Sequence, residues 1–422
     1  MKLQKIINRL QKLHPKEIDL SLDRIINLCK KLNNPQDKIK AISVVGTNGK
    51  YSTIQAMFSI LKENNLKCNI YTSPHIKRIN ERFVFNNQEL DDEQLANLLE
   101  EVEKKNENNL ITFFEILTAA YFYKAAEYPN NINLIESGLF HRFDATNILK
   151  ENLASVITSI GLDHLDWLPE NERTIEKIIY EKTSNLLNSN IIVAKQSSDK
   201  ITDQIKQTIA KNSSNKFFNN KDYNYSLSEN NFLYYEDKIG GIKLPIPNIN
   251  GKFQLDNIST AIATLRSIGI LDIKESHIKT GITKIKSIAR LQEITEGKLK
   301  NLVKDNRLIV DGSHNPLGAK VLNEYLDSLN CNKHIILGMM ANKKHKEYIS
   351  YFKNITSLTT TNIPNQPNSI KGDELKEKLN NFKNIYYKES IVDAIKSIPV
   401  KKNDIILITG SLYLAGEVLN LN

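Results

Sequence analysis

The chain has 422 residues, which is enough for two or three domains with cores of their own. Hydrophobic residues make up 40% and charged residues 25%, and no stretch approaches eighteen consecutive apolar residues, so the composition predicts a globular protein without a membrane span. The formal charge of +9 comes from 57 basic and 48 acidic residues, but no five like charges stand together. We therefore expect a locally positive cleft for an anionic small molecule and no nucleic-acid surface.

The first residues predict a helix, and the cysteines predict a cytoplasmic protein. The helical spacing is carried by Leu3, Ile6, Ile7, Leu10 and Leu13. This pattern differs from the continuous apolar core of a signal peptide. Cys29, Cys68 and Cys331 are far apart and match neither a zinc site nor a disulfide framework. We expect buried thiols in a reducing compartment.

From residue 41 onward, strand-like apolar runs alternate with helical stretches. The runs are AISVV (41–45), INLIE (132–136), ASVITSI (154–160) and NIIVA (190–194). Residues 52–64 have the periodicity of a helix. Such alternation predicts a parallel sheet with helices on its faces. Residues 217–250 are rich in aromatic residues, Asn and Gly, and we expect short antiparallel hairpins that decorate this first domain.

The alternation restarts near residue 287 and predicts a second domain. Its strand candidates are NRLIVDG, HIILGMM, ITSLTTT, NIYYK and DIILITG. We predict an α/β protein with a P-loop ATPase-like domain over residues 1–286 and a Rossmann-like, doubly wound domain over residues 287–422. Ligands of such sheets bind beyond the carboxyl ends of the strands. Because the polar residues of interest lie at those ends, we expect residues of both domains to meet in one cleft.

The stretch GTNGKYST (46–53) follows a predicted strand and opens a predicted helix, as a phosphate-binding loop does. Its glycines let main-chain amides approach an anion, and the positive end of the helix dipole faces the phosphates. Lys50 would reach the β- and γ-phosphates, and the hydroxyl of Ser52 would bind Mg²⁺. The bulky Tyr51 need not block the loop, because the cradle is main chain. The predicted nucleotide contacts here are Gly46, Thr47, Asn48, Gly49, Lys50, Ser52 and Thr53.

Nine stretches, in order along nearly the whole chain, resemble one family. They are GTNGK, YTSPHIKRINER, FFEILTAAYF, LIESGLFHRFDATN, SVITSIGLDHLDWL, GKFQLDN, ARLQ, VDGSHNP and LITGSLYLAGEVL. The first resembles the phosphate loop of Mur-type ligases, which join an amino acid to a carboxylate using ATP. The series resembles their folate branch, the bifunctional dihydrofolate synthase/folylpolyglutamate synthases. The resemblance implies ATP-dependent ligation of L-glutamate to dihydropteroate, to reduced-folate polyglutamates, or to both, through an acyl phosphate.

By the same resemblance, Ser52, Ser73, Glu136 and His164 match magnesium ligands, and the hydroxyl and carboxylate oxygens among them suit this hard cation. Taken alone, Glu136 would be an ordinary strand-end carboxylate and His164 a structural histidine. Lys182 matches a lysine that the family carries as a carbamate, which turns a cation into an anion facing the metal. Its alternative reading is an exposed helix lysine.

The remaining roles implied by the resemblance concern the nucleotide and the two acceptors. Gln254 and Asn257 match positions on the side of the nucleotide base, and Arg290 matches an arginine that reaches the phosphates from the second domain. Asp311, His314 and Ser411 match residues around the phosphates and the incoming glutamate, although Ser411 alone would also suit a cap at a strand end. Phe114 and Asp144 match a pterin pocket, with a ring to stack on and a carboxylate to accept hydrogen bonds.

The chain departs from the family pattern at a few places near these positions. Phe140 and His141 stand where the family has two glycines, Tyr51 stands where it has a small residue, and EKTSN (181–185) lacks the small apolar residues that the family tends to have after the lysine. These changes bear on substrate range. Two alternatives therefore stay open: a non-catalytic nucleotide- or folate-binding protein, and a Mur-type ligase of cell-wall precursors. We expect a monomer.

Overall fold

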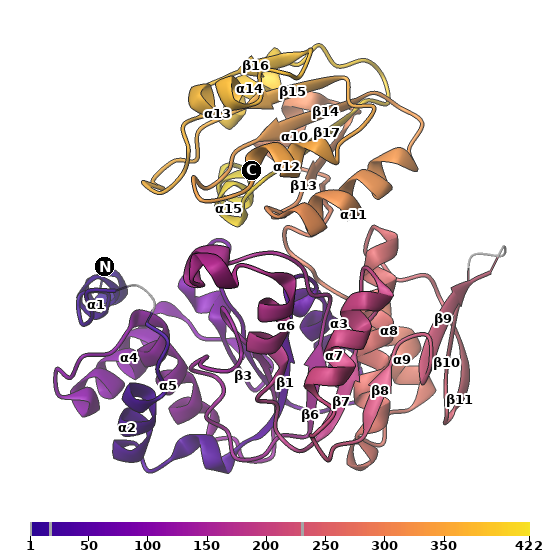
Figure 1. Cartoon of the computed structure of the whole chain (residues 1–422). Coiled ribbons are helices and arrows are strands. Elements are labelled where there is room, and N and C mark those ends of the chain that lie inside the picture. Colours follow the sequence, from indigo (N-terminus) through magenta and orange to yellow (C-terminus); the bar gives the residue numbers. More distant parts are fainter. Residues whose placement is uncertain (1, 17–18, 229–231) are drawn as a thin grey trace. The chain divides into compact units, whose positions relative to one another are not determined.

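The computed structural model describes residues 2–16, 19–228 and 232–422, and the chain divides into two compact units (Figure 1). The N-terminal unit consists of Met1–His164, Leu168–Asn248 and Leu255–Ile285. The C-terminal unit consists of Leu165–Trp167, Ile249–Gln254 and Lys286–Asn422. Among the described residues, no helix has the length and apolar character needed to cross a membrane.

The N-terminal unit is built on an eight-stranded sheet with the order β4-β3-β2-β5-β1-β6-β7-β8. The strands are β1 (Lys40–Val45), β2 (Cys68–Tyr71), β3 (Phe83–Phe85), β4 (Gln88–Glu89), β5 (Ile132–Glu136), β6 (Ala154–Ile157), β7 (Asn190–Val193) and β8 (Lys216–Phe218). Six strands are parallel, and β3 and β4 form an antiparallel edge. The central strands β1, β5 and β6 are buried almost throughout. The continuous apolar runs of the sequence reflect this burial on both faces.

The helices of this unit lie around the sheet or on the helices next to it (Figure 1). They are α1 (Lys2–Leu10), α2 (Asp23–Lys31), α3 (Lys50–Glu63), α4 (Asp92–Asn106), α5 (Phe113–Ala125), α6 (Ile175–Thr183), α7 (Asp199–Thr208), α8 (Lys252–Ser267) and α9 (Glu275–Ile282). Short 3₁₀ segments of this unit lie at η1 (Pro35–Lys38), η2 (Ile79–Arg82), η4 (Glu170–Glu172) and η5 (Gly269–Leu271), whereas η3 (Leu165–Trp167) is grouped with the C-terminal unit. Thr112 and Glu115 form a reciprocal cap that fixes the start of α5.

A second, three-stranded antiparallel sheet belongs to the same unit. It has the order β11-β10-β9 and consists of β9 (Tyr223–Leu227), β10 (Leu233–Asp237) and β11 (Gly240–Leu244). The predicted small β decoration is therefore confirmed. Its predicted start was wrong, because residues 216–218 form β8, a parallel edge strand of the large sheet.

The C-terminal unit has a six-stranded sheet with the order β12-β13-β17-β14-β15-β16. The strands are β12 (Gln292–Ile294), β13 (Arg307–Val310), β14 (Lys333–Leu337), β15 (Ser357–Thr360), β16 (Ile385–Tyr387) and β17 (Ile405–Thr409). The helices are α10 (Lys298–Val303), α11 (Pro316–Asp327), α12 (His345–Ser350), α13 (Gly372–Lys378), α14 (Ile391–Ser397) and α15 (Leu412–Leu421). All five predicted strands are confirmed, and the antiparallel edge strand β12 was not predicted.

Strand register brings distant residues to the same edge of each sheet. Val44 pairs with Glu136 and Val45 with Ile157, so the chain leaves β1, β5 and β6 at adjacent points. In the C-terminal unit, Val310 pairs with Ile408, so the ends of β13 and β17 also lie side by side. These carboxyl ends are where ligands of parallel sheets bind.

Cys29 and Cys68 are buried as expected, but Cys331 is only half-buried. Burial raises the pKa of the Cys29 and Cys68 thiols to about 12. Both thiols are therefore protonated and unreactive at neutral pH.

Candidate active site

In the loop after β1, the backbone at Gly49 has a conformation that only glycine adopts easily. This residue precedes α3 with φ +93°, in the left-handed region. A Cβ at Gly49 would also collide with the amide oxygen of Asn257, and one at Gly46 would collide with the hydroxyl of Thr158. The two glycines therefore let the loop pack directly against α8 and the end of β6.

Two main-chain amides of the loop serve the loop itself. The N–H groups of Thr47 and Asn48 both donate to the carbonyl of Ser159, at 2.9 and 3.1 Å. The hydroxyl of Thr47 donates to the carbonyl of Gly161 and accepts from its amide. Fewer loop amides than predicted are therefore left for a phosphate, and we expect those of Gly49 and Lys50, where α3 begins, to be the ones that face it.

Two lysine side chains meet at the carbonyl oxygen of Gly46. Lys50 donates to it at 3.2 Å and to the carbonyl of Thr47 at 3.3 Å. Lys182, from α6, donates to the same oxygen at 3.0 Å and to the carbonyl of Leu139 at 2.8 Å. The Nζ of Lys50 also lies 3.7 Å from Oε1 of Glu136. The structure thus places Lys50, Lys182 and Glu136 together at the loop.

Lys182 is 2% exposed, so its alternative reading as an exposed helix lysine was wrong. Burial, and next the nearby Lys50, lower the pKa of its amine to about 7, while the carboxylates of Asp163, Asp144 and Glu136 act in the opposite direction. The ring of Phe140 lies over this amine, with its centroid 5.5 Å from Nζ.

The predicted metal ligands come from four separate segments. Ser52 is buried in the first turn of α3, and Oε2 of Glu136 accepts a hydrogen bond from the amide of Ser73 at 3.2 Å. His164 has φ +58°, and its ring stands edge-on to Phe140 at 6.5 Å. Within the described parts of the chain, no three His, Cys, Asp or Glu side chains gather around one point. A hydroxyl and one carboxylate nevertheless fit Mg²⁺ that shares its other positions with nucleotide oxygens and water.

Thr53 lies behind the loop, in the first turn of α3. Its amide donates to the carbonyl of Gly49 at 2.9 Å, which begins the hydrogen-bond ladder of this helix. Its side chain is fully buried. We therefore expect Thr53 to contribute to the start of the helix more than to nucleotide contact.

The chain after β5 folds back so that Asp144 caps its own segment. The amides of Gly138 and Leu139 donate to Oδ2 of Asp144 at 2.9 and 3.2 Å. The amide and hydroxyl of Thr146 donate to Oδ1 at 3.0 and 2.6 Å. Burial raises the pKa of the Asp144 carboxyl, and these four donors oppose that shift. The carboxylate predicted to hold the pterin is therefore already engaged by the protein.

Phe114 lies beside this segment. Its ring edge and Oδ2 of Asp144 both stand next to Cα of Gly138, where only a glycine leaves room for them. The ring also stacks on Tyr71, with centroids 6.0 Å apart. The structure thus brings Phe114 and Asp144 together.

Phe140 and His141, the residues that replace two glycines of the family pattern, are both buried. Nδ1 of His141 lies 3.0 Å from the hydroxyl of Ser137. Burial, and next the charge of Lys182, lower the pKa of the His141 imidazole to about 4, so it is neutral at physiological pH. The amides of His141 and Arg142 both donate to the carbonyl of Glu181, which fastens this segment to α6.

Gln254 and Asn257 lie in the first two turns of α8, and both are buried. Asn257 faces Gly49, as the close approach at that glycine shows. The contact places Asn257 at the phosphate loop. Gln254 is grouped with the C-terminal unit.

The C-terminal unit has a polar cluster of its own at the end of β13. Asp311 accepts hydrogen bonds from the amides of Leu291 and Ser313, both at 2.8 Å. Burial raises the pKa of its carboxyl, and the guanidinium of Arg290 opposes the shift. Nδ1 of His314 lies 2.9 Å from the carbonyl of Gly312, and Nη1 of Arg290 is next to that glycine. Arg290, Asp311 and His314 are therefore neighbours.

Ser411 lies at the end of β17, beside this cluster. Leu412, the residue after it, packs against Gly312. Oγ of Ser411 accepts a hydrogen bond from the amide of Tyr413 and caps α15. A capping role is thus visible for Ser411.

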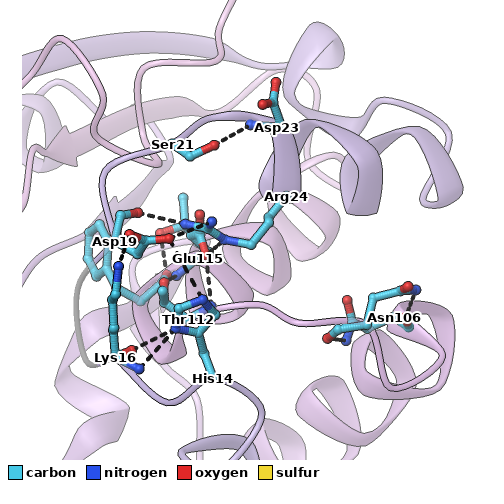
Figure 2. A network of polar contacts seen from close by, with 12 residues as sticks. His14, Lys16, Asp19, Ser21, Asp23, Arg24, Asn106, Thr112 and Glu115 are labelled. Carbon is cyan, nitrogen blue, oxygen red and sulfur yellow. Dashed lines mark hydrogen bonds and ion pairs between the residues drawn. The ribbon is translucent and has the colours of Figure 1, made fainter.

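A polar network outside these clusters holds the start of α5, as Figure 2 shows. Arg24 donates to Oε2 of Glu115 at 3.0 Å and to the carboxylate and main-chain carbonyl of Asp19 at 2.9 and 2.6 Å. Oε2 of Glu115 also accepts from the amide of Thr112 at 2.7 Å. The network ties residues near the N-terminus to the helix turn that carries Phe114. The sequence analysis did not predict this network.

The sequence analysis also missed the residues at the end of β6 that pack against the glycine loop. Thr158 and Ser159, at the end of β6, touch Gly46 and hold two loop amides. Their role depends on the register of β6 against β1, which a single strand pattern does not reveal.

These features define a class of protein, an ATP-dependent ligase of the Mur type. The family model "Mur ligase, glutamate ligase domain" matches residues 293–412. Dihydrofolate synthase/folylpolyglutamate synthase of Haemophilus influenzae is 30% identical, with 97% of this chain and 95% of that protein covered. The enzyme of the same name from Escherichia coli is 28% identical, with 98% and 94% covered.

A solved structure of Escherichia coli FolC in complex with DHPP and ADP superimposes with a TM-score of 0.86. It is 27% identical in sequence, and the match covers 99% of this chain and 97% of that one. The chain belongs to the dihydrofolate synthase/folylpolyglutamate synthase family.

Proposed function

We propose that this protein uses ATP to join L-glutamate to a folate-type carboxylate. The acceptor is dihydropteroate, a reduced-folate polyglutamate, or both, and the reaction passes through an acyl phosphate. The observation that carries the proposal is the meeting of Lys50, Lys182 and Glu136 at a glycine loop that opens a buried helix. Family membership supplies the chemistry of the two acceptors.

A carboxylate resists attack by an amine because it is anionic and lacks a good leaving group. One carboxylate oxygen attacks the γ-phosphorus of ATP, the bond from that phosphorus to the bridging oxygen breaks, and the products are the acyl phosphate and ADP. The glutamate amine then attacks the acyl carbon, an amide bond forms, the C–O bond to phosphate breaks, and the amine loses a proton. We assign Lys50 and the amides at the start of α3 to the charge on the transferred group.

Mg²⁺, when bound, would neutralise charge on the phosphates and polarise the transferred group. Ser52, Glu136, Ser73 and His164 are the residues we assign to hold it. Asn257 and Gln254 are assigned to the nucleotide, and Arg290, Asp311, His314 and Ser411 to the phosphates and the incoming glutamate. Phe114 is assigned to stack on the pterin, while Asp144 shapes the same pocket from behind.

Phosphate release tests the proposal directly. Purified protein with ATP and Mg²⁺ is assayed with glutamate alone, with acceptor alone, and with both, using dihydropteroate and tetrahydrofolate as separate acceptors. We expect release only when glutamate and an acceptor are both present. If no phosphate is released with either acceptor while nucleotide still binds, the result would favour a non-catalytic homologue. Turnover of a uridine-linked cell-wall precursor would favour the other Mur-type branch.

We further propose a functional boundary at residue 286, a monomeric state and a cytoplasmic location. Light scattering of the purified protein tests the monomeric state, because a stable dimer would double the measured mass.

A further inference from the structure

The small antiparallel sheet turns three tyrosines toward the interior of its unit. Tyr223 and Tyr235 are 3% and 0% exposed, and Tyr225 is half-buried. Tyr225 on β9 and Tyr235 on β10 lie directly opposite each other in the ladder. Because side chains alternate between the two faces of a strand, the three rings share one face of the sheet. Their hydroxyls are therefore available to whatever packs on that face.

Two of these hydroxyls contact the N-terminal half of α8, which lies beside the small sheet (Figure 1). Tyr225 donates to Oδ1 of Asp256 at 2.9 Å. The hydroxyl of Tyr223 lies 3.1 Å from that of Thr260, one turn further along the helix. Burial, and next the charge of Asp256, raise the pKa of the Tyr225 hydroxyl above its ordinary value, so this group keeps its proton and donates. Directional bonds therefore fasten the sheet to this half of α8.

The third tyrosine holds the other end of the same helix. Tyr235 donates to Oδ2 of Asp237 at 3.0 Å, and Arg266, in the last turn of α8, donates to that carboxylate at 2.7 and 3.0 Å. Arg266 lies about 15 Å along the helix from Asp256. Tyr225 and Tyr235 thus make the same kind of bond, from a tyrosine to an aspartate, near opposite ends of one helix.

The residue that follows Asp256 on α8 is Asn257, which packs against the glycine loop. A Cβ at Gly49 would come within 2.4 Å of the amide oxygen of Asn257, so the two residues touch without slack. Asp256 and Asn257 share one helical turn, and a bond that fixes the first also fixes the second. The small sheet, α8 and the loop are therefore linked in series.

We propose that the small sheet positions the nucleotide site and that Tyr225 is the positioning residue, because its hydrogen bond to Asp256 holds Asn257 against the glycine loop. The sheet thereby contributes to nucleotide affinity through α8. This inference rests on the proposed function in one respect only, namely that ATP binds at that loop.

Removal of single hydroxyls tests the proposal on the whole protein, titrated with a fluorescent ATP analogue and Mg²⁺ in the absence of folate and glutamate. Tyr225→Phe keeps the ring and should weaken binding of the analogue about 3- to 10-fold, the effect expected from one hydrogen bond. Tyr235→Phe is the matched control, because it deletes a tyrosine–aspartate bond at the far end of α8. It should bind the analogue as wild type does. Urea unfolding of both variants shows whether their stabilities change alike.

A merely structural role would lower the stability of both variants and change nucleotide affinity in neither or equally in both. Either of these results would overturn the proposal. In the ligation assay, Tyr225→Phe should raise the KM for ATP and leave the KM for glutamate unchanged. Wild-type protein that binds no ATP analogue would instead refute the proposed function, so the two failures are distinguishable.

Variants of Asp256 test the bond from its other side. Asp256→Ala should weaken binding of the analogue as Tyr225→Phe does, and the double variant should be no weaker than Asp256→Ala alone, because both changes remove the same bond. Asp256→Asn keeps an oxygen that can accept from Tyr225 and should bind the analogue nearly as wild type does. Losses that multiply in the double variant, or a loss in Asp256→Asn as large as in Asp256→Ala, would show that the hydrogen bond is not what matters.

Discussion

The side chain of Asn257, in α8, lies directly against Cα of Gly49, which precedes α3 and is far away in the sequence. A Cβ at residue 49 would collide with the amide oxygen of Asn257. The backbone at Gly49 also has φ +93°, which disfavours any residue with a side chain. Loop shape and the placement of Asn257 therefore depend on each other.

Gly49→Ala should weaken nucleotide binding and destabilise the fold. The positive φ and the collision together should cost about 1–3 kcal/mol of unfolding free energy. Urea unfolding and titration with a fluorescent ATP analogue measure the two effects. Gly269→Ala is the matched control, because nothing lies within 4 Å of its added Cβ. Equal behaviour of the two variants would contradict the tight packing at Gly49.

Lys50→Ala should abolish ATP-dependent ligation and leave the protein folded. Its amine contacts two loop carbonyls and lies 3.7 Å from Glu136, so it is placed where the charge of a triphosphate would need a counter-charge. We expect a rate loss on the order of 10²–10³-fold. Lys62→Ala, at the exposed end of the same helix, should keep full activity. Retained turnover in folded Lys50→Ala would refute the assignment of the loop.

The pattern of apolar runs predicted the sheets well because central parallel strands are buried on both faces. β1, β5 and β6 are mostly apolar and almost entirely buried, and the sequence located each of them. Short strands were missed: the buried parallel strand β2 has four residues, and β3, β4 and β12 have two or three. A strand of that length has no periodicity from which it can be recognised.

The sequence predicted those site residues whose type and position in a motif already indicate their chemistry. A glycine loop before a helix placed Lys50 and Ser52, and the end of an apolar strand placed Glu136. The partners of these residues were not predictable, because they depend on register and loop closure. The second donor to Gly46 comes from Lys182, far along the chain, and the amides around Asp144 come from its own turn. Neither of these contacts has a motif in the sequence from which it could be predicted.

Arg24→Met should destabilise the protein, because it leaves the buried Glu115 carboxylate without its counter-ion (Figure 2). The Glu115 side chain is only 5% exposed, and we expect a loss of about 2–4 kcal/mol in unfolding free energy. Arg78→Met is the matched control. Arg78 forms an ion pair with Glu89, and the two side chains are 64% and 34% exposed. The expected loss in unfolding free energy is therefore below about 1 kcal/mol. Similar losses in the two variants would show that the Arg24 network adds nothing beyond a surface pair.

His141 should make stability fall as the pH is lowered from about 6.5 toward 4. The pKa of its imidazole is lowered to about 4 in the folded protein by burial, whereas the unfolded chain has the ordinary value near 6.5. Between these values the unfolded state binds the proton and is favoured, at up to about 1.4 kcal/mol per pH unit. Above this window both states are neutral and the full stability is present.

Urea unfolding across this pH window compares wild type with His141→Asn. The variant should show a shallower dependence, since it lacks the depressed group. His75, whose pKa is also lowered to about 4, contributes equally to both proteins and cancels in the comparison. Identical slopes would mean that His141 is accessible to protons in the folded state.

Asp144→Asn should lower the stability of the ligand-free protein. Both carboxylate oxygens accept hydrogen bonds from N–H or O–H donors, so an amide nitrogen in either position would face a donor. We expect a loss of about 1–3 kcal/mol in unfolding free energy. Thr146→Val removes the 2.6 Å hydroxyl bond to Asp144 and a longer one to Ser137 at 3.5 Å, and it should cost less, about 1 kcal/mol. Unchanged stability of Asp144→Asn, together with a large loss of dihydropteroate affinity, would instead assign this carboxylate to direct contact with the substrate.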